Sequence, residues 1–190
     1  MTYSAWRLPL QLVKPLRTIA HTLGAIAVGA VNTLMHHDEP VVELKPGDQA
    51  PDFALPGSDG RTYRLQELAG QPLVIAWFPK AFTGGCTAEC KSLRENSAAL
   101  RKTHARHFAA SVDTPELNAK FAASLDLDYP ILSDVTKSVA RAYGVLGASG
   151  FASRWTFYIG ADGRILEIDK KVSASSHGAD VLSKLTDLTS

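Results

Sequence analysis

Apolar and polar stretches alternate along the chain from about residue 41 to the end, and their periods predict strands and helices in turn. Residues 72–78 (PLVIAWF) form a short apolar run rich in Val, Ile and aromatic side chains, which is typical of a buried strand. Residues 86–100 then predict a helix with Leu93 and Leu100 on an apolar stripe. Further strands are predicted at residues 41–44, 52–55, 62–65, 107–112, 130–132, 154–159 and 164–168, and further helices at residues 115–125, 134–143 and 178–188.

The order of these elements indicates the fold class. Strands alternate with helices, a hairpin follows across residues 160–163, and a helix closes the chain. Such an order predicts an α/β fold with a mixed central β-sheet flanked by helices. Thr114 is expected to cap the helix that starts at Pro115, and Ser133 or Asp134 to cap the next one, which Gly144 ends.

Residues 1–40 differ from the rest and predict an N-terminal hydrophobic helical extension. Residues 19–35 are largely apolar, and as a helix they would span about 25 Å, just short of a hydrocarbon core of about 30 Å. Three interpretations remain open: a membrane anchor with its basic end in the cytoplasm, a secretory signal, or a helix lying on a surface. We therefore divide the chain into an extension, residues 1–40, and a globular domain, residues 41–190.

Composition limits the classes of function. The 190 residues carry a net charge of +1, which gives no indication of a nucleic-acid partner. The two cysteines, Cys86 and Cys90, are too few for a disulfide framework or a four-thiolate zinc site. Two cysteines close together in a chain with a good core favour redox chemistry or metal binding.

Both cysteines lie in residues 79–90 (PKAFTGGCTAEC), between the predicted central strand and the helix that follows it. Thr83 and two glycines indicate a helix start, so Cys86 lies near the first turn. Unpaired N–H groups and the positive end of the helix dipole stabilise a thiolate there. Such settings can lower the pKa of a thiol from about 8.5 into the range of roughly 3.5 to 7.5. This stretch is the candidate active site.

The chain at this point resembles the peroxiredoxins of the AhpC/TSA superfamily. Their motif, Pro-x-x-x-Thr/Ser-x-x-Cys, is matched by Pro79, Thr83 and Cys86. Other family-like segments occur in order at residues 47–53, 111–113, 132–134, 142–145 and 154–157. The placement of the second cysteine just after the first is most similar to that in the bacterioferritin-comigratory, or Q-type, branch of the family. The resemblance implies a thioredoxin-like fold and thiol-dependent reduction of hydrogen peroxide or organic hydroperoxides.

The resemblance also implies roles for single residues. Cys86 would be the peroxidatic cysteine, whose thiolate attacks the peroxide and becomes a sulfenic acid. Thr83 would hold the peroxide with its hydroxyl, and Pro79 would shield the pocket from water. Arg154 would approach from the neighbouring strand and stabilise negative charge. Glu89 resembles a carboxylate that orients the arginine in some branches, although an acid in the first helical turn also favours the dipole.

Cys90 would be the resolving cysteine. Proteins of the Q-type branch usually have four residues between the two cysteines, whereas this chain has three. Side chains four apart on a helix have Cβ atoms about 5–6 Å apart, and a disulfide needs about 3.5–4.5 Å. The first turn would have to unwind, which Gly84 and Gly85 would ease.

Two other functions compete with a peroxidase. Sco-type copper chaperones also carry Cys-x-x-x-Cys on a thioredoxin-like domain, with a histidine shortly before a strand such as residues 154–159. This chain has Arg154 there, and its only histidine after His107 is His177, near the last helix. A disulfide reductase is disfavoured because the spacing is not Cys-x-x-Cys.

The expected protein is thus a peroxidase that needs no metal, haem or flavin. Its expected partners are a hydroperoxide substrate and an external dithiol such as thioredoxin or glutaredoxin. We expect a monomer or a homodimer, with possible membrane association through residues 1–40. The extension favours the bacterial-type cell envelope over the cytoplasm as the location.

Overall fold

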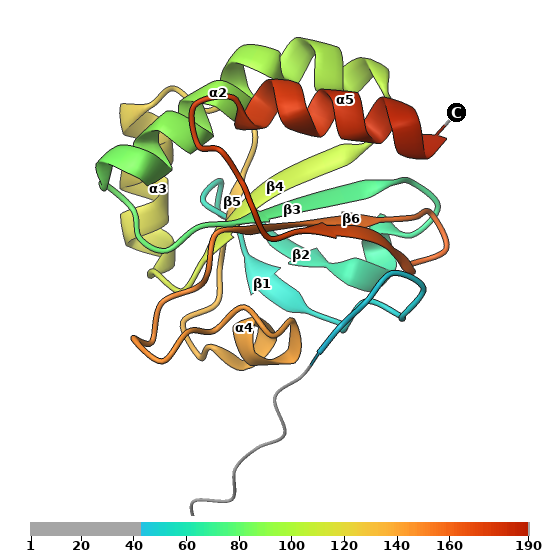
Figure 1. Cartoon of the computed structure of the whole chain (residues 1–190). Coiled ribbons are helices and arrows are strands. Elements are labelled where there is room, and N and C mark those ends of the chain that lie inside the picture. The colour runs from blue at the N-terminus through green and yellow to red at the C-terminus, as the bar shows by residue number, and fades with distance from the viewer. Residues whose placement is uncertain (1–42, 190) are drawn as a thin grey trace, which may run out of the picture. The chain divides into compact units, whose positions relative to one another are not determined.

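The structure is a computed structural model and describes residues 43–189. A five-stranded sheet forms the centre of this part of the chain (Figure 1). The strands lie in the order β5-β4-β3-β6-β7. β3, β4 and β5 are parallel, whereas β6 runs antiparallel to both β3 and β7, so the sheet is mixed. The strands are β3 (Leu73–Trp77), β4 (Arg106–Ser111), β5 (Ile131–Ser133), β6 (Trp155–Ile159) and β7 (Ile165–Asp169).

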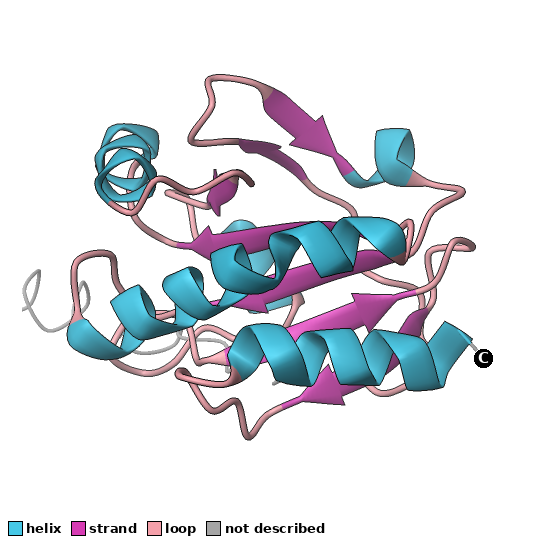
Figure 2. Ribbon diagram, turned by 90° about the horizontal axis from the view of Figure 1, so that it is seen from above, coloured by secondary structure: helices cyan, strands magenta, loops and turns pink. Residues whose placement is uncertain are grey.

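Helices cover both faces of this sheet. On one face α2 (Gly84–Lys102) and α5 (His177–Thr189) run side by side over the strands, and α3 (Pro115–Ser124) packs beside β5 at the edge of the sheet (Figure 2). The other face carries α4 (Ser138–Ala142) and the hairpin β1 (Ala54–Pro56) and β2 (Thr62–Arg64), which continues into the short 3-10 helix η1 (Leu65–Leu68). The predicted thioredoxin-like α/β fold is confirmed. The predicted extension, residues 1–40, and its boundary lie outside the described residues.

β3 separates two hydrophobic cores, because successive side chains of a strand point to opposite faces. Leu73, Ile75 and Trp77 belong to the core under α4 and the hairpin. Val74 and Ala76 belong to the core under α2 and α5. Burial on both sides explains why this run is continuously apolar instead of alternating.

The element boundaries differ from the predicted ones in a few places. α2 is longer than expected at both ends, and α3 has the predicted cap, with the Thr114 hydroxyl accepting a hydrogen bond from the Leu117 N–H. α4 begins at Ser138 and not at Asp134, whose carboxylate instead accepts the N–H of Ala140 at 2.7 Å. Residues 43–44 of the predicted first strand lie outside any strand.

The start of α5 packs closely on α2. The Gly178 N–H donates to Ser92 Oγ at 2.9 Å. A Cβ atom at Gly178 would lie 2.1 Å from the Ser92 carbonyl oxygen. Backbone cannot yield as a flexible side chain does, so only glycine permits this approach.

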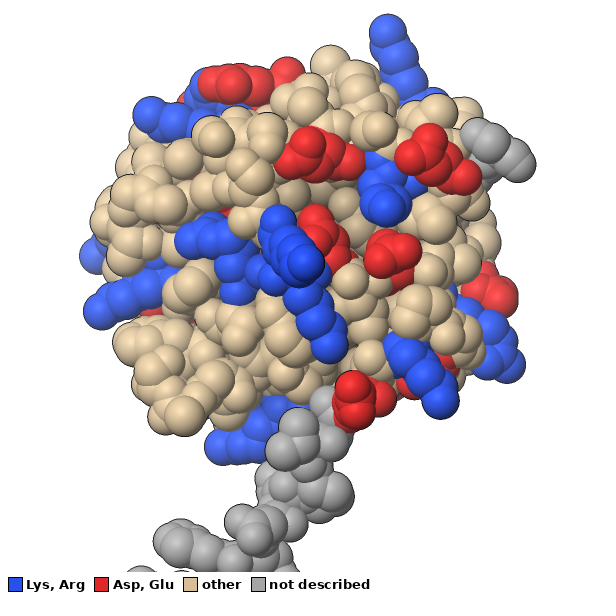
Figure 3. Space-filling model, in the orientation of Figure 1, with Lys and Arg blue, Asp and Glu red and all other residues tan. Residues whose placement is uncertain are grey.

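The surface of the described residues has charges of both signs. Lys and Arg side chains gather near the middle of the face in Figure 3, with acidic side chains beside them. Among residues 43–189, no helix combines the length and the apolar character needed to span a membrane.

Replacement of Gly178 tests the packing of α5 on α2. Gly178→Ala should lower the free energy of unfolding by about 1–3 kcal/mol, because the new methyl group overpacks the contact. Urea denaturation measures this change. Gly84→Ala is the control, since nothing lies within 4 Å of a Cβ atom there, and it should not destabilise the fold. Equal denaturation midpoints for Gly178→Ala and wild type would refute the close packing.

Two buried histidines predict a dependence of stability on pH. Burial lowers the pKa of His107 and of His177 to about 4, against the opposing effect of Asp128 on the first and of Asp169 and Asp180 on the second. Between pH 6.5, their ordinary pKa, and about pH 4, the unfolded chain binds more protons than the folded chain. The free energy of unfolding should therefore fall as the pH drops through this window, and these groups should add no slope above it. Urea midpoints at pH 7.5 and pH 5 test this. A drop that is as large in His107→Gln as in wild type would count against the contribution of His107.

Candidate active site

Cys86 lies at the start of α2, just after the loop that connects β3 to this helix. It is the third residue of α2, and Thr83 occupies the N-cap position. The unpaired N–H groups of this first turn and the positive end of the helix dipole surround the residue, as the sequence predicts. Cys86 is only 1% exposed. Its sulfur is therefore a partly desolvated group whose few polar neighbours decide its reactivity.

The loop between β3 and α2 is held in place from the neighbouring elements. The Ala81 N–H donates to Asp113 Oδ2 at 2.8 Å. Phe82 has a φ of 61°, in the left-handed region that bulky residues rarely adopt. Its ring packs against Phe121 of α3 with 5.0 Å between centroids. Pro79, half-buried, opens the loop. The strained residue and its contacts fix the loop that precedes Cys86.

Strand register brings Arg154 to the same place. Trp155 pairs with Trp77, so the start of the antiparallel strand β6 lies beside the end of β3. Arg154, one residue earlier, reaches the first turn of α2, and its Nη2 donates to Cys86 Sγ at 3.3 Å. A guanidinium stays protonated at any working pH. The predicted pair of Cys86 and Arg154 is thus brought into contact by the fold.

Glu89 anchors the other side of the guanidinium. Arg154 Nη1 donates to Glu89 Oε2 in an ion pair. Glu89 is 1% exposed and the Arg154 side chain 22%, so most of this pair lies out of water. One cation therefore bridges the sulfur and a buried carboxylate, and Glu89 lies where an arginine-orienting carboxylate would.

The two glycines before Cys86 have different surroundings. A Cβ atom at Gly85 would lie 3.1 Å from Arg154 Nη2, whereas one at Gly84 would meet nothing within 4 Å. The sequence interpretation gave both glycines the same part, which was to ease unwinding of the turn. The structure adds that Gly85 leaves room for the guanidinium.

The Thr83 hydroxyl makes a local hydrogen bond. It donates to the Lys80 carbonyl at 3.0 Å and does not cap the helix with its side chain. Its oxygen lone pairs remain able to accept a hydrogen bond from a molecule in the site.

Cys90 lies one helical turn after Cys86 and faces the core. It is 0% exposed, and burial raises the pKa of its thiol to about 12. The Tyr129 hydroxyl donates to the Cys90 carbonyl at 2.9 Å. Cys86 and Cys90 are both free thiols in this structure. An intact helix keeps such a pair too far apart for a disulfide, as the sequence predicts.

The sequence interpretation missed two residues that lie behind this cluster. His177 is buried beside Glu89, and Thr156 is buried beside His177. Their contacts join residues 89, 156 and 177, which no local spacing connects. The one signal in the sequence is Gly178, which directly follows His177 at the start of a predicted helix and indicates close packing of that helix.

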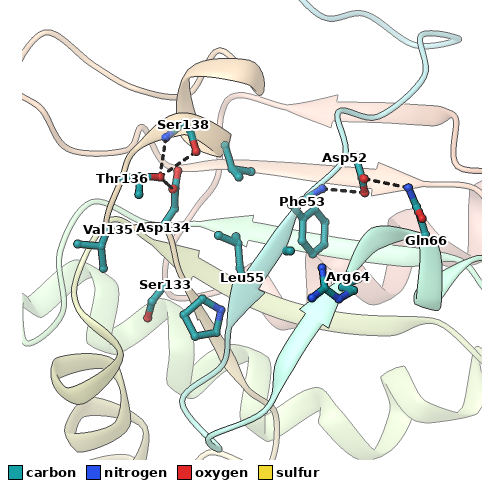
Figure 4. Close-up of a pocket in the computed structure, with 13 residues that line it drawn as sticks. Asp52, Phe53, Leu55, Arg64, Gln66, Ser133, Asp134, Val135, Thr136 and Ser138 are labelled. Carbon is teal, nitrogen blue, oxygen red and sulfur yellow. Dashed lines mark hydrogen bonds between the residues drawn. The ribbon is translucent and has the colours of Figure 1, made fainter.

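A cavity without contact to Cys86 lies elsewhere in the described residues. It measures about 600 Å³ and lies between β1 and the segment from β5 to α4. At one end of the cavity the Gln66 side chain donates a hydrogen bond to Asp52. At the other end Thr136 is hydrogen-bonded to both Asp134 and Ser138 (Figure 4). None of its lining residues belongs to the cluster around Cys86. We assign it no part in the chemistry of the thiol.

Comparison with known proteins agrees with this geometry. Residues 46–168 match the AhpC/TSA family. The chain is 36% identical over 149 residues to peroxiredoxin Bcp of Escherichia coli K12, covering 75% of this chain and 96% of the relative. The crystal structure of peroxidoxin BcpB from Mycobacterium tuberculosis superimposes with a TM-score of 0.71 and 33% identity, over 78% of this chain and all of that one.

A second solved structure, the bacterioferritin comigratory protein of Xanthomonas campestris, has a TM-score of 0.69 and 26% identity over 73% of this chain and 92% of that one. The Sco-like copper-binding alternative has no support. A guanidinium faces Cys86, and His177 faces Glu89 and Thr156. The chain belongs to the AhpC/TSA family and, within it, to the peroxiredoxins.

Proposed function

We propose that the protein reduces hydroperoxides, with Cys86 as the attacking thiolate. The observation that carries the proposal is the hydrogen bond from Arg154 Nη2 to Cys86 Sγ, at 3.3 Å, on the first turn of α2. A fixed positive charge and a helix start both favour the thiolate over the thiol, and the thiolate is the nucleophile.

The chemical step follows from this arrangement. The thiolate attacks one oxygen of the O–O bond, a sulfur–oxygen bond forms and the O–O bond breaks. Cys86 is oxidised to a sulfenic acid, and the departing oxygen leaves as an alcohol or water after it takes up a proton. Negative charge moves from sulfur to oxygen in this step. The Arg154 guanidinium, held by Glu89, is placed to stabilise that charge without reorganising.

Thr83 and Pro79 complete the pocket in this proposal. The Thr83 hydroxyl accepts a hydrogen bond from the peroxide and orients it toward the sulfur. Pro79 covers the approach to Cys86 and keeps water away from the thiolate. Both assignments come from the peroxiredoxin motif and from the position of these residues in the loop before α2.

Cys90 resolves the sulfenic acid. Its sulfur attacks the sulfur of Cys86, a disulfide forms and water leaves. In the folded helix the Cys90 thiol is protonated and buried, since its pKa lies at about 12. The first turns of α2 must therefore unwind, which also breaks the hydrogen bond from Tyr129 to the Cys90 carbonyl.

An external dithiol, of the thioredoxin or glutaredoxin type, then reduces the disulfide and is itself oxidised. The Xanthomonas campestris relative is described for alkyl peroxide reduction, which supports organic hydroperoxides as substrates beside hydrogen peroxide. The protein acts as a monomer or homodimer in this scheme.

The apolar composition of residues 19–35 supports a location in the cell envelope, with membrane association through residues 1–40. The reducing partner must then act on the same side of the membrane, so location and reductant are linked.

Stopped-flow fluorescence on mixing the reduced protein with hydrogen peroxide tests the assignments of both cysteines. We expect a fast, peroxide-dependent change in wild type that Cys86→Ser abolishes. A slower second phase should be lost in Cys90→Ser while the fast phase remains. The reporters are Trp77, in the sheet under the site, and Trp155, next to Arg154. If wild type reacts no faster than a free thiol, the peroxidase proposal fails.

Substitution at Gly85 tests the contact between Arg154 and Cys86. Gly85→Ala should displace the guanidinium from the sulfur and slow the reaction with peroxide about tenfold, the lower end of the usual cost of disturbing a supporting contact. Gly84→Ala is the matched control one residue earlier, and it should react like wild type. Equal rates in Gly85→Ala and Gly84→Ala would show that the guanidinium contact does not matter.

A further inference from the structure

The polar cluster around Cys86 does not end at Glu89. One carboxylate oxygen, Oε2, is paired with Arg154, and the other, Oε1, lies 3.1 Å from His177 Nδ1. Both of these last atoms are fully buried, and neither makes a well-aligned hydrogen bond to any described residue, so their 3.1 Å contact is close without being aligned as a hydrogen bond. A buried acceptor and a buried ring nitrogen thus face each other with no other partner in the described part of the chain. Leaving either one unsatisfied in the interior is unfavourable.

The other ring nitrogen of His177 is also engaged. His177 Nε2 lies 2.7 Å from Thr156 Oγ1. His177 is 1% exposed and Thr156 0%. Thr156 lies two residues after Arg154, so both side chains point to the face of the sheet that α2 and α5 cover. The contacts therefore run from Cys86 through Arg154, Glu89 and His177 and return to the strand that carries Arg154.

The hydrogen-bonding capacity of the three groups assigns the proton. Burial lowers the pKa of His177 to about 4, so the ring is neutral at pH 7 and carries one N–H. A carboxylate can only accept, whereas the Thr156 hydroxyl can donate. The N–H is therefore assigned to Nδ1, the ring nitrogen that lies beside Glu89, and Thr156 is assigned as the donor to Nε2.

Charged groups face this ring from every neighbouring element. They are Glu89 of α2, Arg154 before β6, Asp169 of β7 and Asp180 of α5. A neutral His177 ring contributes no positive charge, so the negative charge of Glu89 stays paired with the Arg154 guanidinium. A protonated ring would compete with Arg154 for the same carboxylate.

We propose that His177, held by Thr156, is a positioning residue that fixes the Glu89 carboxylate and, through it, the Arg154 guanidinium on the Cys86 sulfur. The inference rests on the proposed function, because it assigns a part in the same reaction. A carboxylate held by one oxygen can still rotate about its last torsion, which carries Arg154 away from the sulfur. A donor on the second oxygen prevents this rotation. The Gly178 contact with Ser92 fixes the start of α5, and hence His177, against α2.

Three variants at His177 test the proposal. The amide nitrogen of His177→Asn lies near the position of Nδ1 and can donate to Glu89. The longer amide of His177→Gln lies near Nε2, and His177→Leu removes both contacts. The measurement is the second-order rate of the reduced protein with hydrogen peroxide as a function of pH. His177→Leu and His177→Gln should be slower by about tenfold or more, as expected for loss of a supporting contact. Their half-maximal rates should move to higher pH, and His177→Asn should restore most of the rate and the wild-type pH profile.

His107→Leu is the matched control. His107 is also buried, and burial lowers its pKa to about 4 as well, but its neighbours are Ser97 and the ring of Tyr129, outside the polar cluster of Cys86, Arg154, Glu89 and His177. This variant should lose stability in urea and keep the wild-type rate and pH profile. A rate loss in His107→Leu as large as that in His177→Leu would overturn the proposal, since it would point to general destabilisation. So would wild-type kinetics in a folded His177→Leu.

Two further measurements keep the test decisive. In a Glu89→Ala background, which removes the acceptor, His177→Leu should cause no further loss of rate, because the two residues act through one contact. An additive loss would refute the link.

Alkylation of Cys86 by iodoacetamide across the same pH range reports the thiolate without any peroxide. If no protein reacts with peroxide, the peroxidase proposal fails, whereas the alkylation profiles of the His177 variants still decide the positioning role. If His177→Leu does not fold, the Asn and Gln pair decides it, and equal profiles for the two would refute it.

Discussion

A buried carboxylate must be paired, and the pairing of Glu89 with Arg154 constrains the whole site. An ion taken out of water loses several kcal/mol of solvation, which only a well-placed counterion and hydrogen bonds offset. Glu89 comes from α2 and Arg154 from the start of β6. The sheet must therefore place the start of β6 beside the end of β3, and α2 must begin at that same edge. The sulfur of Cys86 then receives a guanidinium whose direction is already fixed.

Close approach of backbones makes this arrangement possible. Gly85 leaves room for the guanidinium, and Gly178 lets α5 contact the carbonyl of Ser92. A Cβ atom at Gly178 would overlap the Ser92 carbonyl oxygen, and one at Gly85 would crowd the end of the Arg154 side chain. Both glycines act through space, so their importance follows from neighbours that are distant in sequence. The same packing brings His177 to the far side of Glu89 and closes the cluster with buried polar atoms facing one another.

The proposed roles of the two cysteines, attack by Cys86 and resolution by Cys90, place opposite demands on α2. Cys86 needs an intact first turn, since the helix dipole and Arg154 act on it only there. Cys90 needs the turn to open, because it is buried and burial keeps its thiol protonated. The flanking glycines and the three-residue spacing put the hinge of this change beside the reacting sulfur. Tyr129 holds the closed form through the Cys90 carbonyl.

The sequence alone determined the fold class, the position of Cys86 and most elements, because these depend on local periodicity, caps and a short motif. It also indicated Arg154 and Glu89 through the family resemblance. It misplaced the start of α4, where Asp134 bonds to the Ala140 N–H six residues on and caps no helix at its own position. The distinct part of Gly85, the burial of Cys90 under Tyr129 and the neighbours of His177 were decided by tertiary structure. Each depends on contacts between segments tens of residues apart, and strand register and helix packing, which no local pattern records, bring those segments together.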